Sequence, residues 1–351
     1  MKQPITEFSI KSLRTILFIM LAIAIVSVTS LSASEKQIGV SIGYQALPTA
    51  EIVLKEMGWL DQMLGKPVKW VRISSGVQGH SGLLDGTLDF ALLGSSPVAL
   101  GIAKGIPFEV IWIHDIIADN EALVVKADRG IKHITDLKGK RVSAPFGSTT
   151  DYHLWVALML NGLDPSQLQI VYIEPEEMLT AWQNDRIDAG FIWMPTLKKM
   201  ITSGGKILLS SRQLVDRGFP TGNLAVVRKD FGKRYPNIVM NYLRALDRTV
   251  KFCREQPEKA AAAVARQLNI SNDEAMEQMK GVILLTAREQ DQGKYFGGTY
   301  WNFGLYTVLK ETADFLHNKG VVKSLPPREA FLYAVNATFL DKVLQHNKTM
   351  P

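Results

Sequence analysis

Short apolar runs alternate with amphipathic stretches along most of the chain. Residues 38–43 and 68–73 are apolar runs of the length typical of buried strands, whereas residues 50–64 repeat apolar side chains at intervals of three and four, as one face of a helix does. Strands that alternate with helices in this way form mostly parallel sheets, so we predict an α/β fold. Further strands are predicted at 89–93, 110–113, 122–125, 141–144, 170–173, 189–193 and 224–228.

The order of strands and helices occurs twice along the chain, in two successive segments that resemble each other. Residues 84–91 (Leu-Asp-Gly-Thr-Leu-Asp-Phe-Ala) lead a helix end through a turn into a strand, and residues 183–190 (Gln-Asn-Asp-Arg-Ile-Asp-Ala-Gly) do the same. We therefore predict two Rossmann-like lobes, joined by two crossing strands that act as a hinge, and a helical C-terminal region beyond residue 236. Lobe I is assigned residues 35–124 and 226–351, lobe II residues 125–225, and the crossing strands residues 122–126 and 224–228.

The first 34 residues differ from the rest of the chain. Lys2, Lys11 and Arg14 precede an apolar run at 16–28, and a small, polar stretch follows at 29–34. This order is typical of a secretory signal peptide. The run is shorter than the roughly 20 residues needed to cross a bilayer, which favours cleavage and export over a membrane anchor. We expect residues 1–34 to be removed and the mature protein to reside in the periplasm.

Composition and motifs argue against several classes of function. The only cysteine, Cys253, excludes an intramolecular disulfide, and no cysteine follows the apolar run where a lipoprotein would be lipidated. The net charge of +6 is spread among acids, so nucleic acid is not expected as a partner. The six histidines show no metal-ligand spacing, and no phosphate loop, dinucleotide fingerprint or Gly-x-Ser-x-Gly motif is present. We therefore expect no cofactor and no catalysis, with Cys253 on the apolar side of a helix.

Two strand-to-helix turns carry the candidate chemistry. Residues 90–97 end in Gly-Ser-Ser-Pro and residues 142–150 in Gly-Ser-Thr-Thr, each just before a predicted helix. The first turn of a helix has free N–H groups and a dipole that favours negative charge, so paired turns facing one cleft predict an oxyanion site. The alternative is that each turn is only a helix cap. The candidate anion-binding residues are Ser95, Ser96, Ser148, Thr149 and Thr150.

Other side chains could form the remaining wall of a ligand site. Gln45, Tyr152 and Trp193 lie at predicted strand ends or helix starts, and Glu121 begins a crossing strand, where it could pair with an amine. Ordinary core packing is the alternative for Trp193, and an exposed hinge acid is the alternative for Glu121.

With these stretches in place, the chain resembles the periplasmic taurine-binding proteins of aliphatic-sulfonate importers, which have the type II periplasmic binding-protein fold. The resemblance runs from about residue 38 to residue 340. It implies a monomeric receptor that captures a small organosulfonate and delivers it to an ABC permease with its ATPase in the inner membrane. The matching stretches are 43–45, 93–97, 120–126, 148–152, 181–188, 193–195 and 226–231.

The resemblance assigns roles to individual residues. The Ser/Thr residues of the two turns would surround the sulfonate, and Gln45, Glu121, Tyr152 and Trp193 would shape the rest of the site. The chain departs from the family pattern at Asn223, where taurine-binding proteins have an acid that would pair with the ammonium group. Either Glu121 takes over that role or the ligand has no amine.

The sequence is also compatible with two other functions. One is a receptor of the same fold for a pyrimidine, nitrate or an aromatic carboxylate. The other is an enzyme of this fold, such as a sulfinate desulfinase with a cysteine nucleophile or a cysteine-rich pyrimidine synthase. The single Cys253 supports neither of these chemistries.

Overall fold

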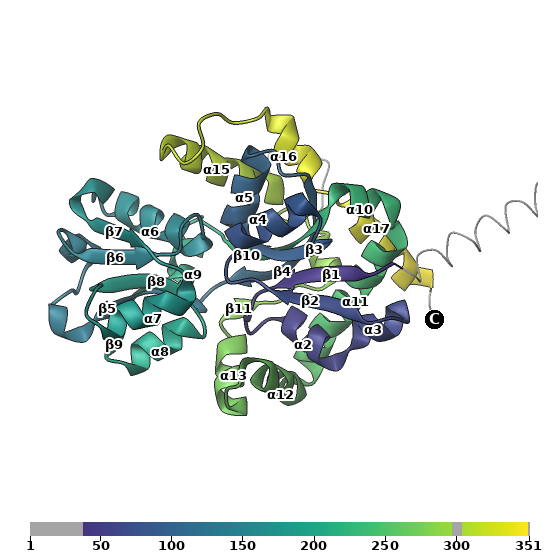
Figure 1. Cartoon of the computed structure of the whole chain (residues 1–351), viewed down its shortest axis with the longest axis horizontal. Helices are drawn as coiled ribbons and strands as arrows, with labels where there is room; N and C mark the ends of the chain where they lie inside the picture. Colours follow the sequence, from purple (N-terminus) through teal and green to yellow (C-terminus); the bar gives the residue numbers. More distant parts are fainter. Residues whose placement is uncertain (1–37, 297–303, 350–351) are drawn as a thin grey trace, which may run out of the picture.

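The computed structural model describes residues 38–296 and 304–349 and shows two α/β lobes side by side (Figure 1). The predicted leader, residues 1–34, lies outside the described residues. Within the described ranges, no helix combines the length and the apolar character needed to cross a bilayer.

Lobe I is built on a six-stranded mixed sheet with strand order β11-β4-β10-β3-β1-β2. The strands β1, β2 and β3 run parallel, and β10 inserts antiparallel between β3 and β4. Helices α4 and α5 cover one face of the sheet, and α2, α3 and α11 cover the other (Figure 1). The strands are β1 (Val40–Tyr44), β2 (Val68–Arg72), β3 (Phe90–Gly94), β4 (Phe108–Ile117), β10 (Gly222–Arg228) and β11 (Val282–Ile283).

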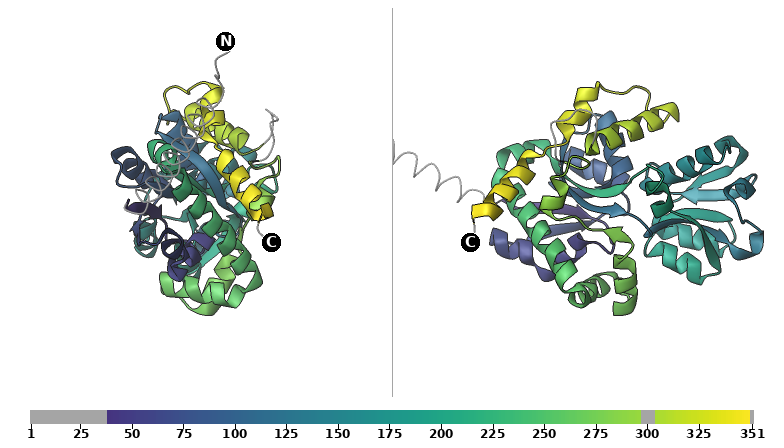
Figure 2. Two further views of the ribbon diagram at one scale, coloured as in Figure 1. Left: turned by 90° about the vertical axis from the view of Figure 1, so that its right-hand side faces the viewer. Right: turned by 180° about the vertical axis from the view of Figure 1, so that it is seen from behind.

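The helices of lobe I come from both ends of the chain. The C-terminal ones pack back onto the lobe: α15 contacts α5, and α17 contacts α11 (Figure 2). The helices are α2 (Ala50–Met57), α3 (Trp59–Leu64), α4 (Gly76–Asp85), α5 (Ser95–Ala103), α10 (Lys229–Arg234), α11 (Pro236–Glu255), α12 (Pro257–Leu268), α13 (Asn272–Met279), α14 (Ala287–Gln290), α15 (Leu305–Asn318), α16 (Arg328–Ala334) and α17 (Thr338–Thr349).

Lobe II has a five-stranded sheet with strand order β7-β6-β8-β5-β9. The strands β6, β7 and β8 are parallel, and β5 runs antiparallel between β8 and β9. The elements are β5 (Glu121–Lys126), β6 (Arg141–Ala144), β7 (Gln169–Tyr172), β8 (Ala189–Trp193) and β9 (Gly205–Ser210), with α6 (Thr149–Leu160), α7 (Pro175–Gln183), α8 (Thr196–Thr202) and α9 (Ser211–Val215).

The chain crosses between the lobes at 118–120 and again at 216–221. All of β5 pairs within the lobe II sheet and all of β10 within the lobe I sheet, so neither strand crosses the gap as 122–126 and 224–228 were predicted to do. The boundaries at 124/125 and 225/226 therefore fall inside strands. An apolar run predicts a strand, but sheet membership depends on pairing partners that the run itself does not reveal.

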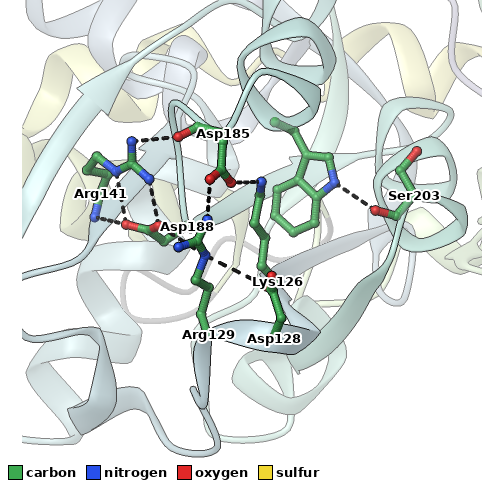
Figure 3. A network of polar contacts seen from close by, with 8 residues as sticks. Lys126, Asp128, Arg129, Arg141, Asp185, Asp188 and Ser203 are labelled. Carbon is green, nitrogen blue, oxygen red and sulfur yellow. Dashed lines mark hydrogen bonds and ion pairs between the residues drawn. The ribbon is translucent and has the colours of Figure 1, made fainter.

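The repeated segment has the same structural role in both lobes. In lobe I, Asp89 Oδ2 accepts hydrogen bonds from the Ser41 N–H and hydroxyl, both at 2.9 Å. In lobe II, Asp188 Oδ2 accepts from the Arg141 N–H at 2.9 Å, and Asp188 Oδ1 lies 2.8 Å from Arg141 Nη2 (Figure 3). Each aspartate thus joins the start of its strand to the neighbouring parallel strand. The sequence repeat reflects two lobes built on one plan.

We expect Asp188→Ala to lower the free energy of unfolding by about 2 kcal/mol, because the part-buried Arg141 N–H and the Arg141 guanidinium would both lose an acceptor. Urea denaturation measures this change. Asp216→Ala, which removes an exposed carboxylate at the end of α9, is the control. Equal midpoints for the two variants would show that Asp188 does not hold the strands together.

Candidate functional site

A cavity of about 30 Å³ lies where the lobes meet, at the carboxyl ends of β1, β3 and β8. Gln45, Gly94 and Asn223 line it from lobe I, and Ser148 and Trp193 line it from lobe II. Parallel sheets bind ligands at this edge because the loops and helix starts that follow the strands converge there.

Four helices begin at the cavity. The wall includes Thr49, Gly76, Gly94 and Ser148, which are at the N-caps or first residues of α2, α4, α5 and α6. No side chain caps the first three of these helices, and the buried Thr49 hydroxyl has no hydrogen-bond partner among the described residues. Their converging N–H groups and dipoles make the cavity favourable for an anion.

The predicted Ser and Thr side chains divide into two groups. Ser148 and Thr149 line the cavity, whereas Ser95, Ser96 and Thr150 do not. The last three hydroxyls are engaged in the framework of the site. The Ser95 hydroxyl accepts from the Gly222 N–H at 3.4 Å, the Ser96 hydroxyl donates to the Gly147 carbonyl at 3.0 Å, and the Thr150 hydroxyl lies 2.8 Å from that of Ser148. In this arrangement, backbone N–H groups are the main donors left for an anion.

The lobes touch directly around the cavity. The bond from Ser96 to the Gly147 carbonyl joins α5 of lobe I to the turn before α6 of lobe II. Just beyond α15, Lys319 pairs with Asp151 at 3.1 Å, and both side chains are buried. Asp151 also accepts from the Gly147 N–H at 3.0 Å. The lobe II turn is therefore held from lobe I on two sides.

Gln45 and Trp193, which were predicted to form part of the ligand wall, line the cavity, but Tyr152 does not. The Tyr152 ring packs edge-on against Phe315 of α15, with 5.1 Å between ring centroids, and burial raises its pKa to about 12. The C-terminal helix α15 covers this side of α6 and gives Tyr152 an aromatic partner. The prediction of Tyr152 as a ligand wall is not supported by its position.

An outer cavity of about 230 Å³ shares Gln45, Leu47 and Trp193 with the inner one. Arg72 lies in its wall and forms a 3.8 Å ion pair with Glu176 of the other lobe. Arg72 and Lys199 line the outer cavity, whereas no lysine or arginine is among the described residues that line the inner one.

Carboxyl groups are buried around the inner cavity. Glu121 lines it, and the Thr149 hydroxyl donates to Glu121 Oε1 at 2.5 Å. Asn223 also lines it, and its Nδ2 donates to Asp115 Oδ1 at 3.0 Å. Burial raises the pKa of Glu121 to about 8 and that of Asp115 to about 7. Asp115 was missed in the sequence, although an acid in the middle of an apolar strand is unusual enough to signal a role.

Cys253 lies in the core of lobe I, 5% exposed, where burial raises its pKa to about 12. A thiol with so high a pKa stays protonated near neutral pH and is a poor nucleophile. It gives the inner cavity no catalytic group, since it is absent from the cavity wall.

Comparison with known proteins identifies a family and several similar proteins. The family model described as NMT1/THI5 like matches residues 68–260. The taurine-binding periplasmic protein of Escherichia coli (strain K12) is 30% identical over 295 residues, which cover 82% of this chain and 89% of that protein. A putative aliphatic sulfonates-binding protein of Bacillus subtilis (strain 168) is 27% identical over 326 residues, covering 91% and 92%.

Solved structures share the fold. The alkanesulfonate-binding protein SsuA from Xanthomonas axonopodis pv. citri, bound to MOPS, aligns with a TM-score of 0.70 and 18% identity. The alignment covers 85% of this chain and 98% of that chain.

Proposed function

Because the chain belongs to the NMT1/THI5-like family and has the periplasmic binding-protein fold, we propose that it is the solute-binding component of an ABC importer and captures taurine or a related organosulfonate. The solute would be delivered to a permease and its ATPase in the inner membrane. Export to the periplasm by the predicted leader fits this role.

The convergence of four helix starts on one cavity is the observation that carries the proposal. A sulfonate has three oxygens that share one permanent negative charge and carry no proton at neutral pH. N–H donors and helix dipoles from both lobes suit such a group without a basic side chain, and charge-assisted hydrogen bonds are stronger than neutral ones.

Lobe closure would complete the site. Donors from α2, α4 and α5 belong to lobe I, whereas the start of α6 belongs to lobe II. A ligand that bonds to both sets therefore favours the closed arrangement, which is how a ligand shifts an equilibrium between two conformations. The contact from Ser96 to Gly147 adds a direct bond between the lobes in this arrangement.

Isothermal titration calorimetry of the purified protein tests the ligand class. The panel is taurine, ethanesulfonate, a matched phosphonate and a hydroxymethylpyrimidine. We expect a sulfonate to bind with a Kd well below about 1 mM. If no sulfonate does so while a pyrimidine or a carboxylate does, the sulfonate proposal is wrong, although the fold assignment stands.

A further inference from the structure

Three buried carboxyl groups, of which one lines the inner cavity, have no lysine or arginine partner among the described residues. Glu51, Asp115 and Glu121 are 0–4% exposed, and Asp115 is close enough to influence the ionisation of both others. No lysine or arginine within residues 38–296 and 304–349 forms an ion pair with any of them. Buried carboxylates are costly unless a positive charge or several hydrogen-bond donors compensate them.

Asp115 and Asn223 form a connected pair on neighbouring strands. They are directly opposite each other in the pairing of β4 and β10, and the Asn223 amide donates to Asp115 Oδ1 at 3.0 Å. Asp115 Oδ2 is buried and has no hydrogen-bond partner among the described residues. Asn223 itself lines the cavity and uses its Nδ2 for Asp115, which leaves its carbonyl oxygen to accept a bond from a ligand. A charge behind an amide strengthens that oxygen as an acceptor.

Glu121 adds a second acceptor from the other lobe. It lines the cavity and begins β5, directly opposite Trp193 in the pairing with β8. Its Oε1 accepts from the Thr149 hydroxyl at 2.5 Å and its Oε2 lies 3.5 Å from the Ser211 hydroxyl, so hydroxyl groups rather than a basic side chain hold it in place. A cation in the cavity would therefore meet a carboxylate from lobe II and a carboxylate-backed amide from lobe I.

We propose that Glu121 and the Asn223 amide bind the ammonium group of the ligand, with Asp115 as the positioning residue whose charge acts through Asn223. The ligand is then an amino-sulfonate, and sulfonates without an amine bind more weakly. This inference rests on the proposed function and specifies its ligand. The negative charge at the amine end is supplied by Asp115 on β4, one strand away from Asn223, so the amide at 223 does not signify a ligand without an amine.

The carboxyl groups also couple ligand binding to the release of protons. Burial raises the pKa of Glu121 to about 8 and that of Asp115 to about 7, so both hold protons in much of the ligand-free protein at neutral pH. An ammonium group favours their charged forms, and its binding releases protons. The other titratable groups around them are Glu51 on α2, Tyr242 on α11, and the buried His114 and His153.

These neighbours do not supply a competing cation. Burial lowers the pKa of His114 to about 3 and that of His153 to about 4, so both imidazoles are neutral near pH 7. Tyr242 donates its hydroxyl to Glu51, and burial holds the pKa of Tyr242 well above its ordinary value. The proton uptake and release on binding is therefore expected to come from the carboxyl groups.

A charge swap tests the proposal. We measure the ratio of taurine affinity to ethanesulfonate affinity by calorimetry for the full-length protein, for Asp115→Asn, and for the double variant Asp115→Asn/Asn223→Asp. We expect a ratio of about 10 or more in the original protein, a fall of about tenfold in the single variant, and recovery to within about threefold in the double variant. Asp128→Asn, which changes an exposed acid beyond the end of β5 that lies away from the cavity, is the control and should keep the original ratio.

A second measurement does not depend on any variant. Taurine is titrated into the original protein in phosphate and in Tris, whose ionisation enthalpies differ, and the apparent enthalpy should depend on the buffer for taurine but not for ethanesulfonate. Equal affinities for the two ligands with no buffer dependence, or a double variant that fails to recover selectivity while still binding ethanesulfonate, would overturn the inference and leave the proposed function intact. If neither sulfonate binds the original protein, the proposed function fails and this inference with it.

Discussion

Gly94→Val is expected to weaken ligand binding at least about 100-fold while leaving both lobes folded. Gly94 ends β3 and caps α5 with a φ of −64° and a ψ of 156°, a conformation that any residue can adopt. A Cβ atom there would lie 3.0 Å from Thr149 Cγ2 of the other lobe and 3.4 Å from Pro97 Cδ. The two further methyl groups of valine would need space that the cavity wall and lobe II occupy in the closed arrangement.

The expected loss corresponds to about 2.8 kcal/mol, within the range that overpacking costs. Calorimetry measures the affinity, and urea denaturation measures the free energy of unfolding, which should change far less because the lobes can move apart. Gly39→Val is the matched control, since no atom lies within 4 Å of a Cβ at that position. If Gly94→Val bound taurine as tightly as the control, the ligand would not require the lobes to meet at Gly94.

Raising the pH from 6.5 to 8 is expected to lower the free energy of unfolding of the ligand-free protein by about 2 kcal/mol. Burial raises the pKa of Glu51 and Glu121 to about 8 and that of Asp115 to about 7. The folded state keeps these protons after the unfolded state has lost them, so stability falls as the pH rises from the ordinary carboxyl pKa toward the raised values. Each group contributes at most about 1.4 kcal/mol per pH unit.

Histidines oppose this trend most strongly at lower pH. Burial lowers the pKa of His80 and His153 to about 4 and that of His114 to about 3, so these residues bind more protons in the unfolded state, an excess that fades as the pH rises through their ordinary pKa of about 6.5. The fall in stability should therefore be clearest above pH 6.5.

Urea titrations at half-unit steps between pH 6.5 and 8 measure this slope. Glu51→Gln keeps the size of the side chain and removes one titrating group, so its slope should be shallower than that of the original protein. Parallel slopes for the two proteins would mean that Glu51 does not hold its proton in the folded state.

The general architecture was predictable because it depends on local patterns. The alternation of apolar runs and helical spacing predicted the α/β fold, which the structure and its structural relatives confirm. The short repeat at 84–91 and 183–190 is now explained, since Asp89 and Asp188 each bond to the neighbouring parallel strand.

The residues that form the site were less predictable, because their positions depend on pairing between segments that are far apart in the sequence. Asp115 meets Asn223 only because β10 inserts beside β4, which brings together residues 108 positions apart in sequence. Tyr152 turns to Phe315 because α15 returns from the C-terminal region to cover α6. No periodicity within a segment shows which distant segment will cover it.

A crystal structure of the protein grown with taurine would locate the ligand directly. We predict that the sulfonate oxygens lie within hydrogen-bonding distance of N–H groups at the starts of α4, α5 and α6, and that the ammonium group contacts Asn223 and Glu121. Taurine bound outside the cleft, or a cleft that stays empty at saturating taurine, would contradict the claim that this protein captures an amino-sulfonate between its lobes.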